Sequence, residues 1–321
     1  MLLQRRFEER TAEAYALGKI GGFCHLYIGQ EAVSTGTISV LRPDDYVITT
    51  YRDHGQALAK GILPRAVMAE LYGKADGCSR GKGGSMHLFD RNVNFLGGHG
   101  IVGAHVPLAT GVGFAIKYRG GDQVCICFMG ESVVNTGAFH EALNMAGLWK
   151  LPVVYIIENN RYGMGTALER ASAIHDVYER GAAYNMTRSQ CDGQDVFAMR
   201  KAVQEAVDRA RKESLPTLLE ARTYRFMGHS MSDAVSGTYR PKAELEEWQK
   251  RDPIVLLRMQ MLDKGELTDD ALNKLDEEIK AHVQDAIDFA EKSPEPPPEA
   301  LYEDVLVDTT SDATAEAVAA D

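Results

Sequence analysis

The chain has 321 residues, 45% of them hydrophobic and 25% charged, which is enough for one large α/β domain or two small ones. Its formal net charge of −11 argues against non-specific binding to nucleic acid or to an anionic membrane. No apolar run approaches the roughly 18 residues that would span a bilayer, so we expect no contact with a membrane interior.

The first third of the chain alternates predicted short helices with glycine-rich loops. Residues 1–19, MLLQRRFEERTAEAYALGK, predict an amphipathic helix and lack the long apolar core of a signal peptide. An apolar run at residues 46–48 precedes Tyr51 and Arg52. Residues 97–105, GGHGIVGAH, are typical of a glycine turn.

Two stretches look superficially like nucleotide-binding loops. Residues 76–83, DGCSRGKG, lack the first glycine of a P-loop and the Ser or Thr after its lysine. Residues 111–113, GVG, lack the third glycine of a dinucleotide fingerprint. We therefore predict neither a P-loop nor a nicotinamide site.

The middle of the chain, residues 121–230, is typical of successive βα units. Apolar runs at residues 124–129, 153–157 and 217–223 predict buried strands. Helical periodicity over residues 135–150 and 195–212 predicts the helices between them, with two apolar stripes: Phe139, Leu143, Ala146 and Leu148, then Phe197, Val203, Val207 and Ala210. We predict a mostly parallel, doubly wound sheet with helices on both faces.

Polar side chains follow two of these strands. Glu131 comes just after the first strand, and Asn160 follows the second strand 29 residues later. Ligands of open α/β sheets bind at the carboxyl ends of the strands. Hard oxygen donors at that edge suit Mg²⁺, which takes few protein ligands beside substrate phosphates.

The last part of the chain predicts helical additions and a tail. Residues 241–293 have helical periodicity, and a proline-rich stretch ends it; the expected apolar positions are Leu272, Leu275, Ile279, Val283 and Ile287. We predict one domain over residues 1–305 and an acidic, disordered tail over residues 306–321. The five cysteines show no CxxC spacing and no disulfide framework, which favours a reduced cytoplasmic protein.

Residues 123–160, QVCICFMGESVVNTGAFHEALNMAGLWKLPVVYIIENN, resemble the thiamine diphosphate motif, in which Gly-Asp-Gly is followed by a βα segment and Asn-Asn. Over residues 5–304 the chain is similar to the α subunits of 2-oxo acid dehydrogenase E1 components, in particular those of the pyruvate branch. The resemblance also includes, in order, GFCHLYIGQEA, TYRDHG, GKGGSMH, GGHGIVGAHVPLATG and TYRFMGHSMSD. It implies a thiamine diphosphate-binding fold.

The resemblance also implies a site. Glu131, the Asn160 side chain and the Tyr162 carbonyl would bind Mg²⁺. The cofactor-binding set would be Tyr51, Arg52, Gly100, Val102, Glu131, Ser132, Val133, Asn160, Arg225 and His229. His229 and His25 would face the reacting centre. One departure is that Glu131 and Ser132 replace the usual Asp-Gly, although branched-chain relatives also carry Glu there. A serine is poorly suited to this turn if it requires positive φ.

The implied reaction is oxidative decarboxylation of pyruvate with transfer of the acyl group to the lipoyl domain of an E2 protein. The glutamate that activates the cofactor would come from a β subunit in an α₂β₂ assembly, so this chain alone would be inactive. Branched-chain 2-oxo acids or acetoin are alternative substrates, and a non-catalytic subunit with a degenerate metal site is an alternative of another class. Residues 227–239 are predicted to form a flexible loop, and nothing in the sequence assigns a regulatory role to its Ser230 and Ser232.

Overall fold

The computed structural model describes residues 1–233 and 237–305. Part of the loop predicted over residues 227–239, and the whole tail predicted over residues 306–321, lie outside the described residues. The division into a domain over residues 1–305 and a tail therefore stays a prediction.

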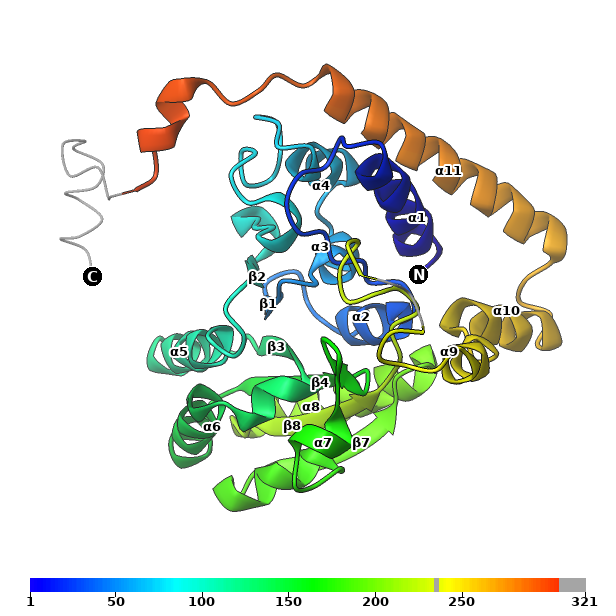
Figure 1. Ribbon diagram of the computed structural model, residues 1–321. Helices are drawn as coiled ribbons and strands as arrows, with labels where there is room; N and C mark the ends of the chain where they lie inside the picture. The colour runs from blue at the N-terminus through cyan, green and yellow to red at the C-terminus, as the bar shows by residue number, and fades with distance from the viewer. Residues whose placement is uncertain (234–236, 306–321) are drawn as a thin grey trace.

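A central sheet of six strands organises the molecule (Figure 1). Its order is β2-β1-β3-β4-β8-β7, and every neighbouring pair is parallel. Its strands are β1 (Tyr46–Thr50), β2 (Phe95–His99), β3 (Cys125–Gly130), β4 (Val153–Asn159), β7 (Thr187–Asp192) and β8 (Thr217–Arg222). A small antiparallel pair, β5 (Tyr162–Gly163) and β6 (Thr166–Ala167), lies beyond the end of β4. The predicted parallel sheet is confirmed.

Helices cover both faces of the sheet. The α-helices are α1 (Leu2–Ala16), α2 (Glu31–Ile38), α3 (His54–Lys60), α4 (Pro64–Leu71), α5 (His105–Tyr118), α6 (Gly137–Trp149), α7 (Leu168–Ala171), α8 (Val196–Glu213), α9 (Lys242–Gln249), α10 (Pro253–Asp263) and α11 (Asp269–Lys292). Short 3₁₀ helices are η1 (Gly84–Met86), η2 (Arg91–Val93), η3 (Glu131–Asn135), η4 (Val177–Tyr184) and η5 (Pro298–Tyr302).

Successive residues of the central strands enter two separate apolar cores. On β3, Cys125 and Cys127 pack in one cluster with residues of α5 and α6. Ile126 and Phe128 pack in the other cluster, which includes residues of α1, α3, α4, α8 and α11. This period of two is that of a strand buried on both faces, and it confirms the doubly wound arrangement.

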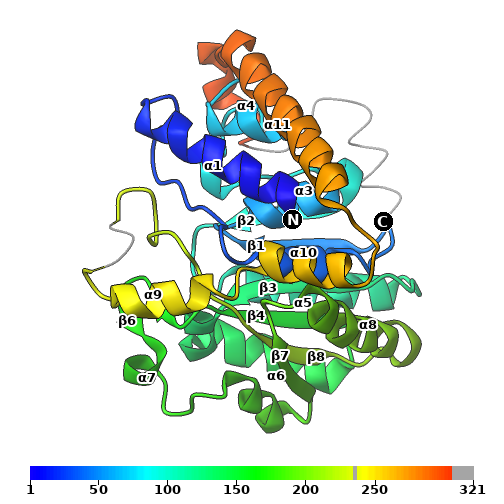
Figure 2. The ribbon, with the colours of Figure 1, turned by 90° about the vertical axis from the view of Figure 1, so that its right-hand side faces the viewer.

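The C-terminal helices form the predicted addition. α11 contacts α4 and α1, and Figures 1 and 2 show it running across the two helices, away from the sheet. None of the helices in the described part of the chain has the length and hydropathy that a membrane span needs.

Some details of the predicted elements were wrong. The first βα helix begins at Gly137 because residues 131–135 form a 3₁₀ turn and the Thr136 hydroxyl caps the helix by accepting from Phe139 N–H. Three residues expected on buried stripes are exposed instead: Leu148, Phe197 and Leu275. Leu148 lies two residues, or about 200°, from Ala146, which turns it away from the sheet.

Candidate active site

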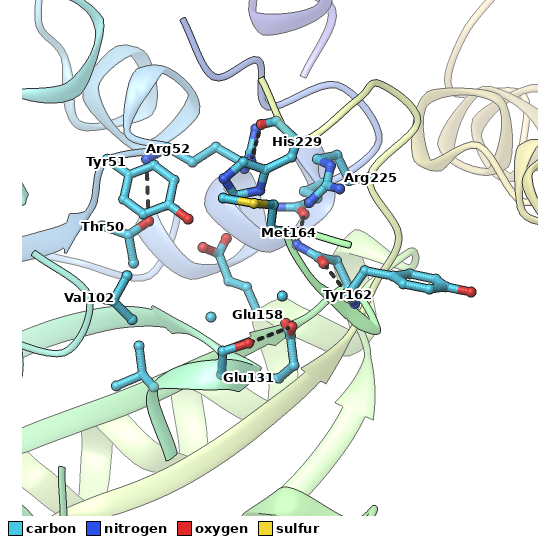
Figure 3. Close-up of a pocket in the computed structure, with 16 residues that line it drawn as sticks. Thr50, Tyr51, Arg52, Val102, Glu131, Glu158, Tyr162, Met164, Arg225 and His229 are labelled. Carbon is cyan, nitrogen blue, oxygen red and sulfur yellow. Dashed lines mark hydrogen bonds between the residues drawn. The ribbon is translucent and has the colours of Figure 1, made fainter. Parts of the chain in front are cut away.

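A cavity of about 240 Å³ lies at the carboxyl edge of the sheet (Figure 3). Its lining residues are Gln30, Thr50, Tyr51, Arg52, Val102, Gly130, Glu131, Ser132, Val133, Glu158, Asn160, Tyr162, Gly163, Met164, Arg225 and His229. Its walls follow the ends of β1, β3 and β4.

Sheet topology explains this position. β1 lies between β2 and β3, so the chain leaves β1 toward the face that holds α3 and leaves β3 toward the face that holds α6. The loops after these two strands therefore diverge and leave a crevice. Ligands of doubly wound sheets bind at such a switch point.

Glu131 is the carboxylate on the β3 side of the cavity. Its side chain is buried, and Ser132 Oγ donates a hydrogen bond to Glu131 Oε1 at 3.3 Å. Burial raises the pKa of Glu131, and main-chain N–H groups and the positive charge of Arg225 oppose that shift only in part. A buried carboxylate whose charged form is still disfavoured overall is chemically suited to bind a cation.

The Glu131-Ser132 departure is accommodated locally. Ser132 is not among the described residues with positive φ, so the turn does not require glycine there. A Cβ atom placed on Gly163 would come within 2.0 Å of Ser132 Oγ. The serine hydroxyl thus occupies space that a glycine on the facing loop leaves open.

The β4 side supplies neutral oxygens. Asn160 Nδ2 donates to Gln30 Oε1 at 3.0 Å, which fixes the side-chain amide so that Asn160 Oδ1 is left as the acceptor. That oxygen accepts only a long hydrogen bond, of 3.4 Å, from Tyr162 N–H. Tyr162 is anchored through its hydroxyl, which donates to Glu244 at 2.7 Å. One carboxylate, one amide oxygen and a nearby main-chain carbonyl form a donor set that fits Mg²⁺.

Two buried arginines place positive charge near these oxygens. Arg52 donates to the main-chain oxygens of Leu26 at 2.6 Å and His229 at 2.7 Å. Arg225 donates to the Met227 carbonyl at 3.1 Å and to the Tyr239 hydroxyl at 2.9 Å. Burial, with the charge of Arg225, lowers the pKa of Arg52 to about 10, so the Arg52 guanidinium remains cationic at neutral pH.

Three rings form a cluster at the cavity. The ring centroids of His25 and Tyr51 are 4.6 Å apart, and those of His25 and His229 are 5.2 Å apart. Burial lowers the pKa of His229 to about 4 and that of His25 to about 2, with Arg52 adding to both shifts. Both imidazoles are therefore neutral at pH 7. Within the described residues, the buried Nδ1 atoms of His25 and His229 have no hydrogen-bond partner.

The structure brings most of the predicted site residues together. Those that line the cavity are Tyr51, Arg52, Val102, Glu131, Ser132, Val133, Asn160, Tyr162, Arg225 and His229. His25 stands behind Tyr51 and His229 and does not line the cavity. Gly100 does not line it either and lies against the His87 ring, 3.3 Å from the position of an added Cβ. The roles of all these residues stay predictions.

Sequence reasoning did not assign Gln30, Thr50, Glu158 and Met164 to the site, although they line the cavity. Glu158 accepts hydrogen bonds from the Tyr27 hydroxyl and from Gln56 Nε2, the latter at 3.1 Å. Burial raises the pKa of Glu158 to about 7. The position of Glu158 directly before the Asn-Asn pair was the sequence signal that could have assigned it to the site. The strand predicted over residues 153–157 ended before Glu158, which the structure includes in β4.

Among the described residues, no three His, Cys, Asp or Glu side chains gather as a metal cluster. A Mg²⁺ site built from one carboxylate and neutral oxygens does not need such a cluster. The oxygens of Glu131, Asn160 and Tyr162 are therefore sufficient as a candidate donor set for Mg²⁺.

Comparison with known proteins agrees with this geometry. The sequence model of one family, described as dehydrogenase E1 component, matches residues 1–299. Proteins named pyruvate dehydrogenase E1 component subunit alpha are similar over nearly the whole chain. That of Rhizobium meliloti is 51% identical over 96% of this chain and 88% of its own length. Those of Rickettsia felis and Zymomonas mobilis are 48% and 49% identical, over 95% and 96% of this chain and 93% and 86% of their own lengths.

The family match and the six-stranded parallel sheet together confirm the expected thiamine diphosphate-binding fold. The chain belongs to the dehydrogenase E1 component family.

Proposed function

We infer that this chain is the α subunit of a pyruvate dehydrogenase E1 component, an oxidoreductase that uses thiamine diphosphate. One observation carries the inference: a single cavity combines the buried oxygens of Glu131 and Asn160 with the guanidiniums of Arg52 and Arg225. Oxygens that suit Mg²⁺ and cations that suit a diphosphate are needed together only where a metal diphosphate binds. The names of the relatives supply the substrate, pyruvate.

We propose Mg²⁺ as the metal, held by Glu131 Oε, Asn160 Oδ1 and the Tyr162 carbonyl. Bound thiamine diphosphate supplies a nucleophilic carbon for the 2-oxo group and an electron sink for decarboxylation. Arg225 and Tyr51 would contact the diphosphate. Arg52 has two of its nitrogens committed to main-chain oxygens, so it adds fixed positive charge and ties the His229 segment to β1.

His229 is suited to hold or pass a proton at the reacting centre. Its imidazole is neutral, so it can donate from one nitrogen and accept at the other. Arg52 fixes its main chain, and Ser230 and Asp233 hold the next turn through hydrogen bonds of 2.7 and 2.9 Å. His25, which packs on both Tyr51 and His229, would orient the two rings and assist at the same centre.

We propose that a β subunit completes the site in an α₂β₂ assembly and that the lipoyl domain of an E2 protein receives the acetyl group. The support is the glycine-rich loop of residues 97–105, which borders the cavity through Val102 and carries no carboxylate. The family resemblance implies that the glutamate beside the aminopyrimidine would come from the β subunit. We also propose a cytoplasmic location, since all five cysteines are free.

The test is pyruvate-dependent reduction of an artificial electron acceptor in the presence of thiamine diphosphate and Mg²⁺. This chain would be assayed alone, and then mixed with the β subunit of the same organism. We expect turnover only in the mixture. Turnover by the chain alone would refute the shared site, and an inactive mixture that assembles would support the non-catalytic alternative.

Branched-chain 2-oxo acids and acetoin are the second candidate substrates, favoured by Glu131 in place of aspartate. The same assay with 2-oxoisovalerate and acetoin decides between them through the ratios of kcat/KM. We expect pyruvate to have the highest value.

A further inference from the structure

Behind the cavity, the structure holds a buried chain of three polar side chains, which we call the clamp: Glu8, His54 and Ser85. Glu8 Oε2 lies 2.9 Å from His54 Nδ1, and His54 Nε2 lies 2.9 Å from Ser85 Oγ. The three residues come from α1, α3 and η1. An acid, an imidazole and a hydroxyl in this order can serve nucleophilic catalysis where a substrate reaches the hydroxyl. Ser85 is only 3% exposed, so the clamp must serve another purpose.

His54 is placed to donate in both directions. Its Nδ1 atom faces the Glu8 carboxylate, and its Nε2 atom also lies 3.1 Å from the main-chain oxygen of Ser85. A carboxylate and a carbonyl oxygen both accept, so both ring nitrogens are best satisfied as donors. Burial lowers the pKa of His54, but the charge and hydrogen bond of Glu8, with smaller contributions from Asp53 and Ser85, raise it overall. The doubly protonated ring thus holds Glu8 and Ser85 at the same time.

Both ends of the clamp hold the same short main-chain segment, residues 25–27. The N–H of His25 donates to Ser85 Oγ at 3.3 Å. The N–H of Tyr27 donates to Glu8 Oε1 at 2.7 Å. Because His54 joins Glu8 to Ser85, the clamp and the segment close a hydrogen-bonded ring.

The segment carries two side chains to the site. The His25 ring packs on the rings of Tyr51 and His229, with centroids 4.6 and 5.2 Å away. Its buried Nδ1 atom has no hydrogen-bond partner in the described part of the chain, so the main chain and ring packing set its orientation. The Tyr27 hydroxyl donates to Glu158, which lines the cavity. A shift of the segment would therefore move both rings relative to the cavity.

Close packing transmits any change in the clamp to this segment. A Cβ atom placed on Gly55, the residue after His54, would come within 2.2 Å of the Tyr27 ring. From α1, Gln4 Nε2 donates to the Gly55 carbonyl at 2.8 Å. Helices α1 and α3 contact each other, and Figures 1 and 2 show them on the same side of the sheet. The first turn of α3 is thus held between α1 and the segment.

We propose that Glu8, His54 and Ser85 are positioning residues for His25, which fix its main chain so that its imidazole meets His229 at the reacting centre. The proposal rests on the proposed function, in which both imidazoles act there. Of the described residues that line the cavity, none belongs to the clamp. Loss of the clamp should therefore lower kcat while leaving the binding of thiamine diphosphate and the KM for pyruvate nearly unchanged.

The test is a double-mutant cycle between Ser85 and His25 in the complex with the β subunit. Ser85→Ala, His25→Ala and the double variant are compared by kcat and by KM for pyruvate with an artificial electron acceptor. We expect Ser85→Ala to lower kcat at least tenfold at an unchanged KM, and to have no further effect where His25 is already alanine. Equal losses in both backgrounds, or full activity of His25→Ala, would overturn the proposal.

Ser172→Ala is the matched control. Ser172 is also buried, accepts from Arg180 at 3.1 Å and donates to a main-chain oxygen at 2.7 Å, but it belongs neither to the clamp nor to the cavity lining. Its kcat should equal that of the wild type, and a loss as large as that of Ser85→Ala would overturn the proposal. Glu8→Gln, which keeps the side-chain size and removes the charge that faces His54, replaces Ser85→Ala in the cycle if circular dichroism shows that Ser85→Ala does not fold.

A second measurement does not depend on turnover. Hydrogen exchange of the amides of residues 25–27, measured in the full chain alone, should be at least tenfold faster in Ser85→Ala than in the wild type and unchanged in Ser172→Ala. Unchanged exchange in Ser85→Ala would overturn the proposal. A wild-type complex that assembles without turnover would refute the proposed function, and faster exchange in that case would still support the clamp, so the two failures are distinguishable.

Discussion

Glu131 is the residue on which the metal assignment depends. It is buried, its carboxylate accepts a hydrogen bond from Ser132, and its pKa is raised by burial. Such a group gains most from a bound cation, since the cation removes the cost of burying the charge. Its neighbour Ser132, which stands in place of the usual glycine, has its hydroxyl in the space beside Gly163.

Replacement of Glu131 by Gln should therefore reduce Mg²⁺-dependent binding of thiamine diphosphate to this chain by more than about tenfold, the lower end of what even outer-shell metal partners contribute. Glu131→Asp, which restores the usual residue, should retain most of the affinity. Isothermal titration with and without Mg²⁺ measures both. Equal affinities for the Gln variant and the wild type would show that another group binds the metal.

His229 makes the stability of the folded chain depend on pH, and the direction of this effect follows from its pKa. Its folded pKa is lowered to about 4 from an ordinary value near 6.5, so between these values the unfolded chain binds a proton that the folded chain does not. His229 consequently makes the fold less stable as pH falls from about 7 toward 4. Glu158 and Asp53, whose pKa values are raised to about 7, act in the opposite direction.

Because the contributions of His229, Glu158 and Asp53 overlap in pH, the effect of His229 is measured by comparing the stability of a His229 variant with that of the wild type. His229→Asn should lose less stability than the wild type between pH 7 and pH 5, by about 1 kcal/mol once solvent screening of this partly exposed ring is allowed for. Urea unfolding of both proteins at the two pH values measures this difference. Parallel losses would mean that the folded His229 has an ordinary pKa.

At the scale of elements, one loop that resembles an anion-binding motif binds a carboxylate of the chain itself. The loop after α4 wraps its main-chain N–H groups around the buried carboxylate of Glu70. Ser79 and Gly81 donate to Oε2, each at 2.8 Å, and Gly83 and Gly84 donate to Oε1 at 2.7 and 3.1 Å. This nest explains the resemblance of residues 76–83 to a P-loop: the loop does hold an anion, but the anion belongs to the chain.

Glu70→Gln should leave some of these N–H groups without an acceptor and destabilise the chain by about 3 kcal/mol. Because the effect is centred on the loop, trypsin should cleave at Arg80 or Lys82 faster than in the wild type. Asp45→Asn is the control, since Asp45 is also a buried carboxylate but holds β3 and α8 instead. Equal cleavage rates in the two variants would refute a local effect.

The same scale shows which elements the sequence could predict. The apolar runs of β3, β4 and β8 are buried on both faces, so composition alone identified them. β7 was missed because it is a polar edge strand, TRSQCD, and β2 was missed because it contains two glycines. The cavity residues Gln30 and Met164 come from loops with no periodicity, and only their position in the folded chain reveals them.

At the scale of the whole molecule, a partly buried ion network ties the N-terminal helix to the C-terminal addition. Arg5 on α1 lies 2.6 Å from Glu31 at the start of α2 and 2.8 Å from Asp252, the cap of α10. Glu31 in turn accepts from Gly29 N–H, beside the cavity residue Gln30. The first helix of the chain and the start of α10 thus meet close to the site.

Arg5→Ala leaves the buried carboxylate of Glu31 unpaired and should lower the free energy of unfolding by about 3–5 kcal/mol. Arg10→Ala on the same helix removes an exposed pair with Glu13 and should cost less than about 1 kcal/mol. Denaturant titration of both variants tests the contrast. Similar small losses would show that the Arg5 network contributes little to holding the addition.

The cavity draws its lining from segments between residues 30 and 229, so it exists only when the entire sheet has formed. A ligand that binds there binds only the folded chain. At a free concentration of 100 times its Kd, it stabilises the folded state by about 2.7 kcal/mol. Vitamin supply would then act on the abundance of this protein as well as on its turnover. In cells short of thiamine, more of the chain would be open to proteases at any moment.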